Sequence, residues 1–424
     1  MCAEEDEALI FISIASYRDP QLAATVQSCL AAASRPERLR FGICWQHDET
    51  EAPPAPAHDA RFRVEAVAWQ SSGGACWARA EAMKLWQGEP WFLQLDSHCR
   101  MCPGWDSLLI RTAGATGSEK PVLSTYATAF TPASTEVLEQ IPLQMALAGF
   151  TSEGIPHFRP VAVPAHRLHG RPLRARFLSA GFLFAPGQFI RDVPYDPELY
   201  FQGEEAALTL RAFTHGYHLF HPAEAVVWHD YVREGQRRHW DDHVEQRTAR
   251  AWHERDAVSK ARLVRLLRGE PLDDFNLGTA RTLNDYEVYA GLSLQHGKAQ
   301  GYTLRSEEPP NPPAECGWAE LTLNWMVQLR VPVDALPAAA WQDIAFWYLG
   351  VFDVSGNEIY REDLTETAVL SASRTEAELV LSCEVPSDNP PTSWKIWPVS
   401  RTQGWLPAVE GAFAADDTAS GRTP

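Results

Sequence analysis

Apolar and polar residues along the first half of the chain form blocks that predict alternating strands and helices. The β-branched run LIFISIASY (9–17) is typical of a buried strand, and residues 19–34 place an acid and a proline before Ala-rich helical spacing. Further strands are predicted at LRFGICWQ, RVEAVAWQ and WFLQLDSH, and a helix after the glycine-rich turn of GGACWARAEAMKLWQGE. This alternation indicates an α/β fold with a mostly parallel sheet, whose ligands bind beyond the carboxyl ends of the strands.

The next segments continue the mixture of strands and helices. Residues 174–187 (RARFLSAGFLFAPG) come next, and residues 223–233 (AEAVVWHDYVR) contain a short apolar strand that ends on Trp228-His229. A helix is predicted from about Glu204 to His215, with Gly216 as its stop. The basic stretch 250–268 is typical of a solvated amphipathic helix.

The character of the sequence changes after RSEEPPNPPAEC (305–316), whose composition is that of a Pro-rich linker. Beyond it, several segments alternate apolar and polar residues, and VSGNEI is a plausible hairpin turn. We therefore predict an antiparallel β-sandwich over residues 317–410, either a binding module or an appendage that packs on the preceding domain. Residues 411–424 have the composition of a disordered tail.

Composition and charge exclude some classes of protein. The formal net charge of -18 comes from 55 acidic and 37 basic residues, which argues against a nucleic-acid-binding surface. The amino terminus carries acids where a signal peptide needs basic residues, and no apolar run is long enough to span a membrane. The expected protein is soluble and cytoplasmic.

The eight cysteines are spread through apolar stretches, which favours reduced, buried thiols over a disulfide framework. The pair Cys99 and Cys102 has the spacing of half a zinc site, but no second pair accompanies it. Buried thiols are the favoured interpretation of this pair.

The strand WFLQLDSH ends in side chains that bind metals or transfer protons. Residues i and i+2 of a strand face the same side, so Asp96 and His98 would present an oxygen and a nitrogen ligand together while Ser97 faces away. Mixed ligation of this kind suits a borderline divalent ion such as manganese. His229, at the end of another predicted strand, is the candidate third ligand. A D-x-H triplet also occurs often by chance, and its position at a strand end in a βα framework favours the metal site.

A metal ion held by three protein ligands leaves positions for substrate oxygens, which a diphosphate fills well. An acidic protein can thus bind a nucleotide sugar without a basic patch. The polar cluster Ala15-Ser16-Tyr17-Arg18 follows the first strand, and we expect it to lie in the same crevice as the Asp96 cluster.

Several motifs together resemble a known family. ISIASYRDPQLAATVQSCLAAASRPERLRFGICWQ, GACWARAEAMKLWQGEPWFLQLDSHCRMCPGWDSLLI, FLSAGFLFAPG, YFQGEEAALTLRAFTHGYHLFHPAEAVVWHDYVR and LGTARTLNDYEVYAGL occur in the order found in the polypeptide hydroxyproline α-N-acetylglucosaminyltransferases and their bacterial relatives. These enzymes are similar in turn to the polypeptide GalNAc transferases. The resemblance spans about residues 9–293, and the carboxyl-terminal part lies outside it.

The resemblance implies a GT-A fold, Rossmann-like, and retaining transfer from a UDP-sugar such as UDP-GlcNAc. The expected division of the chain is a transferase domain (1–250) and its helical extension (251–304), followed by the linker (305–316), the sandwich (317–410) and the tail (411–424) that composition and alternation predict. Residue by residue, it implies manganese ligation by Asp96, His98 and His229. Donor contacts are implied for Ala15, Ser16, Tyr17, Arg18, Arg79, Asp96 and Ser97.

Glu204 and Glu205 match an acidic pair at the sugar end of such sites, one contacting hydroxyls and the other favouring the start of a helix. Trp105 and Asp106 are candidates for the wall of the donor pocket. A tryptophan at this position could equally belong to the core. The resemblance suggests front-face attack by the acceptor hydroxyl, in preference to a covalent intermediate on either glutamate. The two extra small residues in SSGGACWAR and the added sandwich set this chain apart from the family and leave its acceptor open.

The leading hypothesis is therefore a manganese-dependent retaining glycosyltransferase that moves GlcNAc from UDP to a hydroxyl of a protein or glycan. One alternative is an inactive GT-A scaffold that binds carbohydrate or protein through its sandwich. Another is a metal-dependent hydrolase of sugar nucleotides, which would release free sugar without an acceptor.

Overall fold

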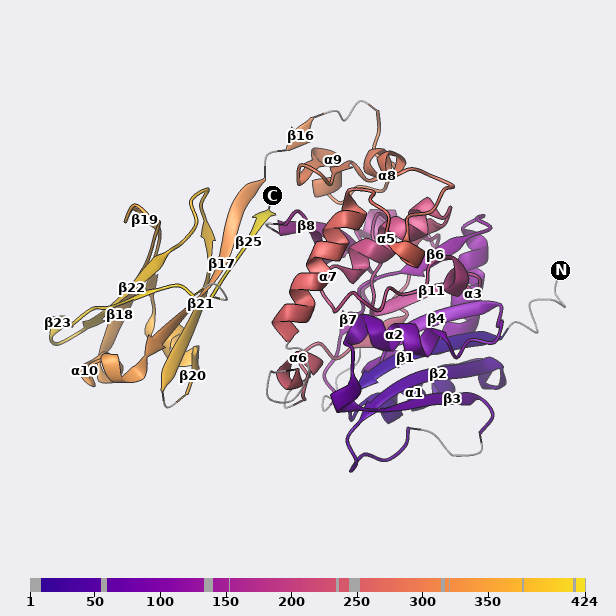
Figure 1. The fold of residues 1–424 in the computed structure, drawn as a ribbon, viewed down its shortest axis with the longest axis horizontal. Coiled ribbons are helices and arrows are strands. Elements are labelled where there is room, and N and C mark those ends of the chain that lie inside the picture. The colour runs from indigo at the N-terminus through magenta and orange to yellow at the C-terminus, as the bar shows by residue number, and fades with distance from the viewer. Residues whose placement is uncertain are drawn as a thin grey trace. The chain divides into compact units, whose positions relative to one another are not determined.

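The computed structural model divides the chain into two compact units (Figure 1). It describes residues 9–423 apart from 55–58, 133–139, 152, 234–235, 244–251, 314–316, 320, 376 and 415–416. The first unit comprises Met1–Leu147 and Ile155–Trp318, and the second comprises Ala148–Gly154 and Ala319–Pro424. The second unit thus includes a short segment from the middle of the chain as well as the carboxyl-terminal part.

The first unit is built on an eight-stranded sheet. In spatial order its strands are β10 (Leu173–Arg174), β12 (His218–His221), β6 (Pro121–Ser124), β11 (Phe182–Pro186), β4 (Trp91–Asp96), β1 (Ile10–Tyr17), β2 (Leu39–His47) and β3 (Phe62–Ala68). Strands β4, β1, β2 and β3 are parallel, as predicted. The sheet as a whole is mixed, because β11 runs antiparallel between β4 and β6, and β10 pairs antiparallel with β12.

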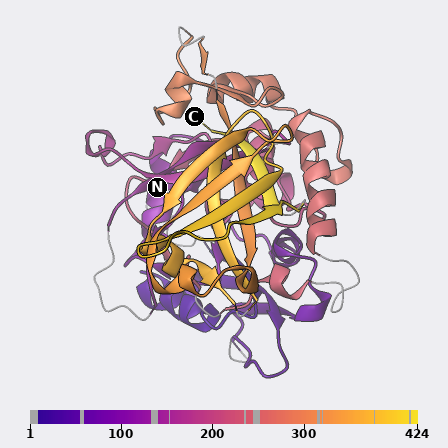
Figure 2. The same ribbon diagram turned by 90° about the vertical axis from the view of Figure 1, so that its left-hand side faces the viewer.

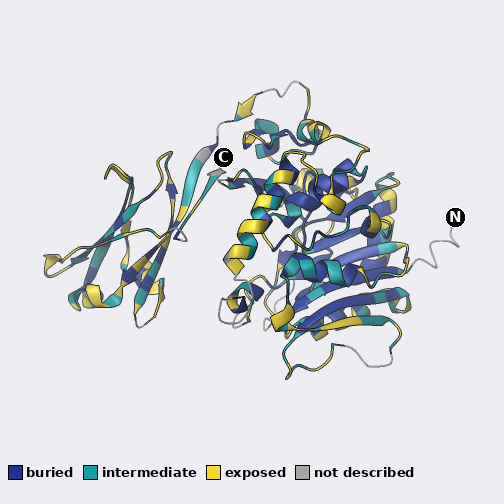
Figure 3. Cartoon of the chain, viewed as in Figure 1, coloured by how far each residue is buried: buried dark blue, intermediate teal, exposed yellow. Residues whose placement is uncertain are grey.

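Helices cover both faces of this sheet (Figure 1). Apolar residues of α1 (Leu22–Ala32) and α3 (Trp105–Ala115) share one core with β1, β2 and β4. On the other face α2 (Ala75–Met83) packs Ala78 and Ala82 against Cys44 of β2. Because both faces are covered, β1 and β2 are buried along nearly their whole length, and Figure 3 shows these central strands in the buried colour.

The remaining elements of the first unit lie mostly after β6. The helices are α4 (Phe189–Asp192), α5 (Glu204–Thr214), α6 (His239–Asp242), α7 (Trp252–Leu267), α8 (Leu283–Ala290) and α9 (Gly301–Leu304). A small sheet joins β5 (Cys99–Met101), β13 (Val227–His229) and β7 (Thr128–Ala129), and β14 (Leu292–Ser293) pairs with β15 (Lys298–Gln300). The predicted helices at 204–215 and 250–268 correspond to α5 and α7, and α7 has the exposed outer face expected of a solvated helix (Figure 3).

The segment predicted as a linker is held on the first unit by ion pairs. Glu307 pairs with Arg167, and Glu308 pairs with Arg171 at 2.9 Å. Asn311 is buried and accepts a hydrogen bond from Arg176 at 2.5 Å. Residues 314–316 lie outside the described part of the chain.

The second unit consists of two antiparallel sheets that share one core. The strands of the first sheet are β20 (Ser373–Arg374), β21 (Glu378–Pro386), β17 (Thr322–Pro332), β25 (Thr418–Thr423) and the end of β8 (Leu143–Thr151). The strands of the second sheet are β19 (Glu358–Leu364), β18 (Ile344–Phe352), β22 (Ser393–Ser400), β23 (Gly404–Trp405) and β24 (Val409–Ala412). Figures 1 and 2 show these strands from two directions. Alternate residues such as Val327, Leu349 and Ile396 form the core between the sheets.

Two features of this unit differ from the sequence-based expectation. The predicted disordered tail is corrected by β25, which pairs antiparallel with β17 from Thr322↔Thr423 to Val327↔Thr418. Backbone pairing with two neighbouring strands stabilises this segment despite its small, polar side chains. The segment Ala148–Gly154 lies within the transferase domain expected from the sequence, but it belongs to this second unit, where Thr151 pairs with Gly421.

Candidate active site

A cavity of about 680 Å³ opens at the carboxyl ends of β1, β2 and β4 in the first unit. Parallel pairing sets Ala15 of β1 beside Asp96 of β4 and Tyr17 beside Gln46 of β2, so three strand ends reach the same edge. Of the two clusters predicted to share a crevice, Ala15 and Tyr17 of the first and Asp96, Ser97 and His98 of the second line this cavity.

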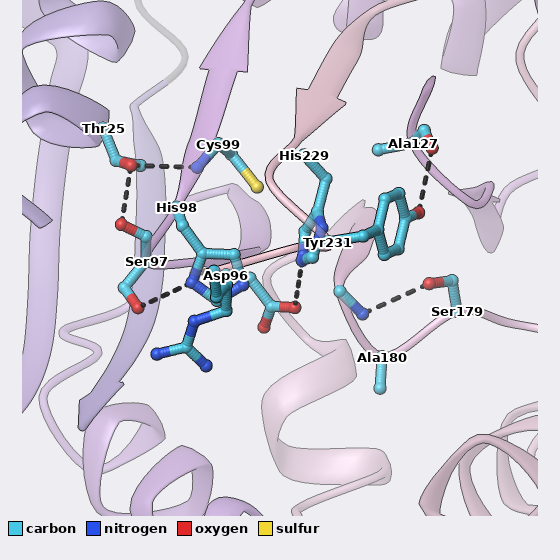
Figure 4. A network of polar contacts seen from close by, with 12 residues as sticks. Thr25, Asp96, Ser97, His98, Cys99, Ala127, Ser179, Ala180, His229 and Tyr231 are labelled. Carbon is cyan, nitrogen blue, oxygen red and sulfur yellow. Dashed lines mark hydrogen bonds and ion pairs between the residues drawn. The ribbon is translucent and has the colours of Figure 1, made fainter. Parts of the chain in front are cut away.

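Asp96, His98 and His229 come together in this cavity (Figure 4). One potential ligand atom of each lies within 4.8 Å of the others. His229 reaches the site because β13 pairs antiparallel with β5, which sets His229 opposite Cys99, the residue after His98. In the described part of the chain this is the one such group of three His, Cys, Asp or Glu side chains.

The geometry differs from the strand model in one respect. Strand β4 ends at Asp96, and Ser97 and His98 form the turn that leads into β5. The two ligands therefore converge through a turn and not through the i, i+2 alternation of a strand. Ser97 does not face away either, because it also lines the cavity and donates a hydrogen bond to Asp19 at 2.6 Å.

Asp19 holds the imidazole of His98 in place. The Asp19 carboxylate lies 2.7 Å from Nδ1 of His98, and its side chain is fully buried. Burial opposes the charge on Asp19, but hydrogen bonding and attraction from His98 outweigh it and lower the pKa of this carboxyl. A carboxylate on Nδ1 leaves the Nε2 lone pair for a metal, an arrangement common around ligating histidines. Sequence reasoning missed Asp19, although it follows Arg18 directly.

Arg79 of α2 links Asp96 to Glu204 of α5. Its guanidinium lies 2.7 Å from Oδ1 of Asp96 and 2.5 Å from Glu204, and only 7% of its side chain is exposed. The other carboxylate oxygen, Oδ2 of Asp96, lies 3.2 Å from Nε2 of His229. Burial opposes ionisation of Asp96, but Arg79 and then His229 outweigh it and hold the pKa of the carboxyl below its ordinary value.

The two glutamates at the start of α5 have different environments. Glu204 is buried and contacts Arg79 and, at 3.2 Å, the thiol of Cys76. Glu205 accepts hydrogen bonds from the Tyr126 hydroxyl at 2.6 Å and the Ala180 backbone N–H at 3.0 Å. Burial raises the pKa of Glu205 to about 7, against the opposing effect of these two donors. Both glutamates line the cavity.

The other predicted donor-site residues divide into two groups. Ala15 and Tyr17 line the cavity, whereas Ser16 is buried and points to the other side of β1. Arg18 lies outside the cavity wall and pairs with Asp242 at 2.8 Å and Asp48 at 3.1 Å. Residues 15–17 are the end of β1, not a loop after it.

Trp105 and Asp106 do not belong to the cavity. Trp105 is fully buried in the core, and its indole N–H donates a hydrogen bond to the backbone carbonyl of Cys29 at 3.0 Å. Asp106 accepts backbone hydrogen bonds from Ser34 and Arg35, both at 2.8 Å, and so fixes the turn after α1. Cys99 and Cys102 are free, buried thiols, and burial raises the pKa of Cys102 to about 11.

A segment that the sequence did not point to forms the far wall of the cavity. Arg238, His239 and Trp240 line the cavity, and α6 is tied to the sheet because Asp242 accepts hydrogen bonds from Tyr17 at 3.1 Å and Arg18 at 2.8 Å. The adjacent aromatic residues His239-Trp240 were the signal in the sequence that could have identified it. In the structure Trp240 lies beside Phe201, with 5.1 Å between the ring centroids.

An α/β sheet with a cluster of one carboxylate and two imidazoles at its carboxyl edge defines a candidate metal-dependent enzyme. The family described as Glycosyltransferase (GlcNAc) matches residues 9–60 and 55–296, more than half of the chain. The chain therefore belongs to this family.

Solved structures of glycosyltransferases are more distantly similar. GalNAc-T7, solved with UDP, GalNAc and Mn²⁺, is 15% identical with a TM-score of 0.44, and the match covers 55% of this chain and 45% of the GalNAc-T7 chain. Residues 1–349 of TarS from S. aureus, in complex with UDP-GlcNAc, are 13% identical with a TM-score of 0.37, covering 63% of this chain and 68% of TarS 1–349. The chain thus spans less than half the length of GalNAc-T7. No curated protein matches it.

No helix in the described residues is long and apolar enough to cross a membrane.

Proposed function

We propose that this chain transfers GlcNAc from UDP-GlcNAc to a hydroxyl of a protein or glycan, with retention of the anomeric configuration, and that the first unit is a GT-A domain. The observation that carries the proposal is the meeting of Asp96, His98 and His229 in a cavity at the carboxyl edge of the sheet of a GlcNAc-type glycosyltransferase. The resemblance to the hydroxyproline GlcNAc transferases supports the choice of sugar and stereochemistry.

The donor set fits a divalent ion of the manganese type. Oδ2 of Asp96, Nε2 of His98 and Nε2 of His229 supply one oxygen and two nitrogens, while Oδ1 of Asp96 is held by Arg79 and Nδ1 of His98 by Asp19. A bound Mn²⁺ would supply charge to the diphosphate as it leaves. The protein's contribution is to fix these atoms before the donor arrives, through Arg79 and Asp19.

We assign different roles to the two glutamates. Glu204 is engaged by Arg79, so we propose that it positions Arg79 and, through it, Asp96. Glu205, with a pKa near 7 and a Tyr126 hydroxyl beside it, would form hydrogen bonds with hydroxyls of the sugar or the acceptor. Neither role requires a covalent intermediate, which is consistent with front-face attack.

The second unit, with two antiparallel sheets and a shared core, is proposed to be a β-sandwich accessory domain.

Calorimetric titration of UDP and UDP-GlcNAc, with Mn²⁺ and with a chelator, tests the donor site. Binding should require the metal and should be lost in Asp96→Ala, while Asp274→Ala, an exposed aspartate on the surface, should bind like the unsubstituted protein. Metal-independent binding, or unchanged binding by Asp96→Ala, would refute the metal assignment. Release of free GlcNAc at the same rate with and without acceptors would identify a hydrolase instead.

A further inference from the structure

The two sheets of the second unit carry different side chains on their outer faces. Between their core residues, β17 and β21 of the first sheet present mainly polar side chains outward, such as Gln328, Ser382 and Glu384. Strands β18, β22 and β23 of the second sheet present aromatic rings instead. A cluster of exposed rings is not needed to form the core, and such clusters commonly mark binding sites.

The side chains of Phe346, Trp397 and Trp405 form this cluster, which we call the aromatic face. Phe346 of β18 and Trp405 of β23 lie on either side of Val399 of β22. The ring centroids of Trp397 and Trp405 are 4.5 Å apart, and those of Phe346 and Trp405 are 5.7 Å apart. Trp405 is 51% exposed, so its ring is accessible to a ligand.

Trp397 is fixed by contacts with its neighbours. Its indole N–H donates a hydrogen bond to the backbone carbonyl of Leu406 at 2.7 Å. The ammonium group of Lys395 lies 4.7 Å from the centre of the Trp397 ring and pairs with Glu410 at 2.8 Å. Because the ring is already ordered, binding of a ligand to it would cost little side-chain entropy.

Charges of both signs lie beside the aromatic face. On one flank Lys395 pairs with Glu410, and on the other Arg361 covers the ring of Tyr348 and lies 3.4 Å from Asp363. Each of these cations thus has a carboxylate next to it. Such a surface has no strong field of one sign with which to attract a nucleic acid or an anionic membrane, and it favours a neutral ligand.

The exposed area of the aromatic face suits a small ligand. Trp405 is half-exposed and the other two rings are mostly covered, so together they offer at most about 300 Å². A stable protein–protein interface buries about 800 Å² on each partner. One or two sugar rings match the smaller area, whereas a second copy of this chain would need more.

We propose that the aromatic face binds a neutral glycan whose pyranose rings carry equatorial substituents. The axial C–H groups of such a ring carry a partial positive charge and are attracted to the negative face of an indole or phenyl ring. Sugar hydroxyls can accept hydrogen bonds from Lys395 and donate them to Glu410. This site goes beyond the proposed function and does not rest on it, because the residues of the catalytic cavity take no part.

Calorimetric titration of the full chain with chitotetraose and with cellotetraose, in the presence of a chelator, tests the proposal. The unsubstituted protein should bind at least one of these neutral tetrasaccharides, and Trp405→Ser should bind it about tenfold or more weakly because one stacked ring is lost. Trp318→Ser removes a tryptophan that is 45% exposed in the first unit and should bind like the unsubstituted protein.

Several outcomes would overturn the proposal. They are the absence of binding of either tetrasaccharide, unchanged binding by folded Trp405→Ser, and an equal loss in Trp318→Ser. Loss of glycan binding in Asp96→Ala would locate the glycan in the catalytic cavity instead. Titration of UDP with Mn²⁺ measures the donor site separately, so each proposal can fail alone.

A second measurement and a second variant complete the test. If sedimentation shows that the unsubstituted protein self-associates and Trp405→Ser does not, the aromatic face is a contact between copies and the proposal is wrong. If Trp405→Ser does not fold, Glu410→Gln takes its place, because the Glu410 side chain is 66% exposed. Glu410→Gln should bind the tetrasaccharide severalfold more weakly, and unchanged binding would then overturn the proposal.

Discussion

Replacement of Arg79 by methionine tests the electrostatic framework of the site. The guanidinium is nearly buried and sits between Asp96 and Glu204, whose side chains are 23% and 6% exposed. Arg79→Met keeps much of the aliphatic packing but leaves two carboxylates in a poorly solvated place. Removal of one partner from a buried ion pair typically costs about 3–5 kcal/mol of unfolding free energy.

The cost should depend on pH with a definite sign. In the unsubstituted protein the pKa of Asp96 is lowered, so its ion pair stabilises the fold above the ordinary carboxyl pKa, and this stabilisation is lost as the pH falls through the folded value. Without Arg79 the carboxylates take up protons more readily, which relieves their repulsion in acid. The difference in stability between variant and parent should therefore be largest near pH 7 and smaller near pH 4.5.

Thermal and urea unfolding at these two pH values would measure the effect. At pH 7 we expect a melting temperature lower by roughly 5–10 °C, and Mn²⁺ should restore part of it by neutralising Asp96. Arg111→Met, on the exposed face of α3, removes the same charge without a buried partner and should change little. The reasoning is refuted if Arg79→Met behaves like Arg111→Met at pH 7, or if its deficit is the same at both pH values.

Two further predictions concern the neighbouring acids. Asp19→Ala should lower the affinity for Mn²⁺ by about 10- to 100-fold, because His98 loses the carboxylate that contacts its Nδ1. An unchanged affinity in a manganese titration would show that Asp19 does not orient the imidazole of His98. The pKa of Glu205 is raised to about 7, so its burial destabilises the fold progressively as the pH rises from about 4.5 through 7. Glu205→Gln should therefore raise the melting temperature more at pH 8 than at pH 5, and an equal change at both values would contradict the raised pKa.

The sequence predicted most of the α/β framework because its elements are long and strongly patterned. Strands β1, β2 and β4 and helices α1 and α5 were predicted with ends close to those observed, since buried strands and helical spacing bounded by glycine or proline leave clear local signals. The antiparallel β11 was not recognised as such, because the direction of a strand is decided by tertiary connections and not by its residues. The same reason hid the membership of Ala148–Gly154 in the second unit.

The candidate site was predicted unevenly. Asp96, His98 and His229 were identified by position and by resemblance to a family, although the turn at Ser97-His98 replaced the strand geometry assumed for them. Asp19 was missed, because its importance lies in its contact with His98, which is distant in the sequence. Trp105 was ambiguous, since a tryptophan near a motif fills a core as readily as it lines a pocket.

The second unit is assembled from two distant parts of the gene. Thr151 leaves the ribosome long before Gly421, its partner in the sheet, so this sheet can form only after β25 has been synthesised. A recombination that exchanged only the carboxyl-terminal segment would separate β25 from β8, the neighbouring strand with which it pairs. Exchange of this unit between relatives would therefore have to carry residues 148–154 along with the carboxyl-terminal strands.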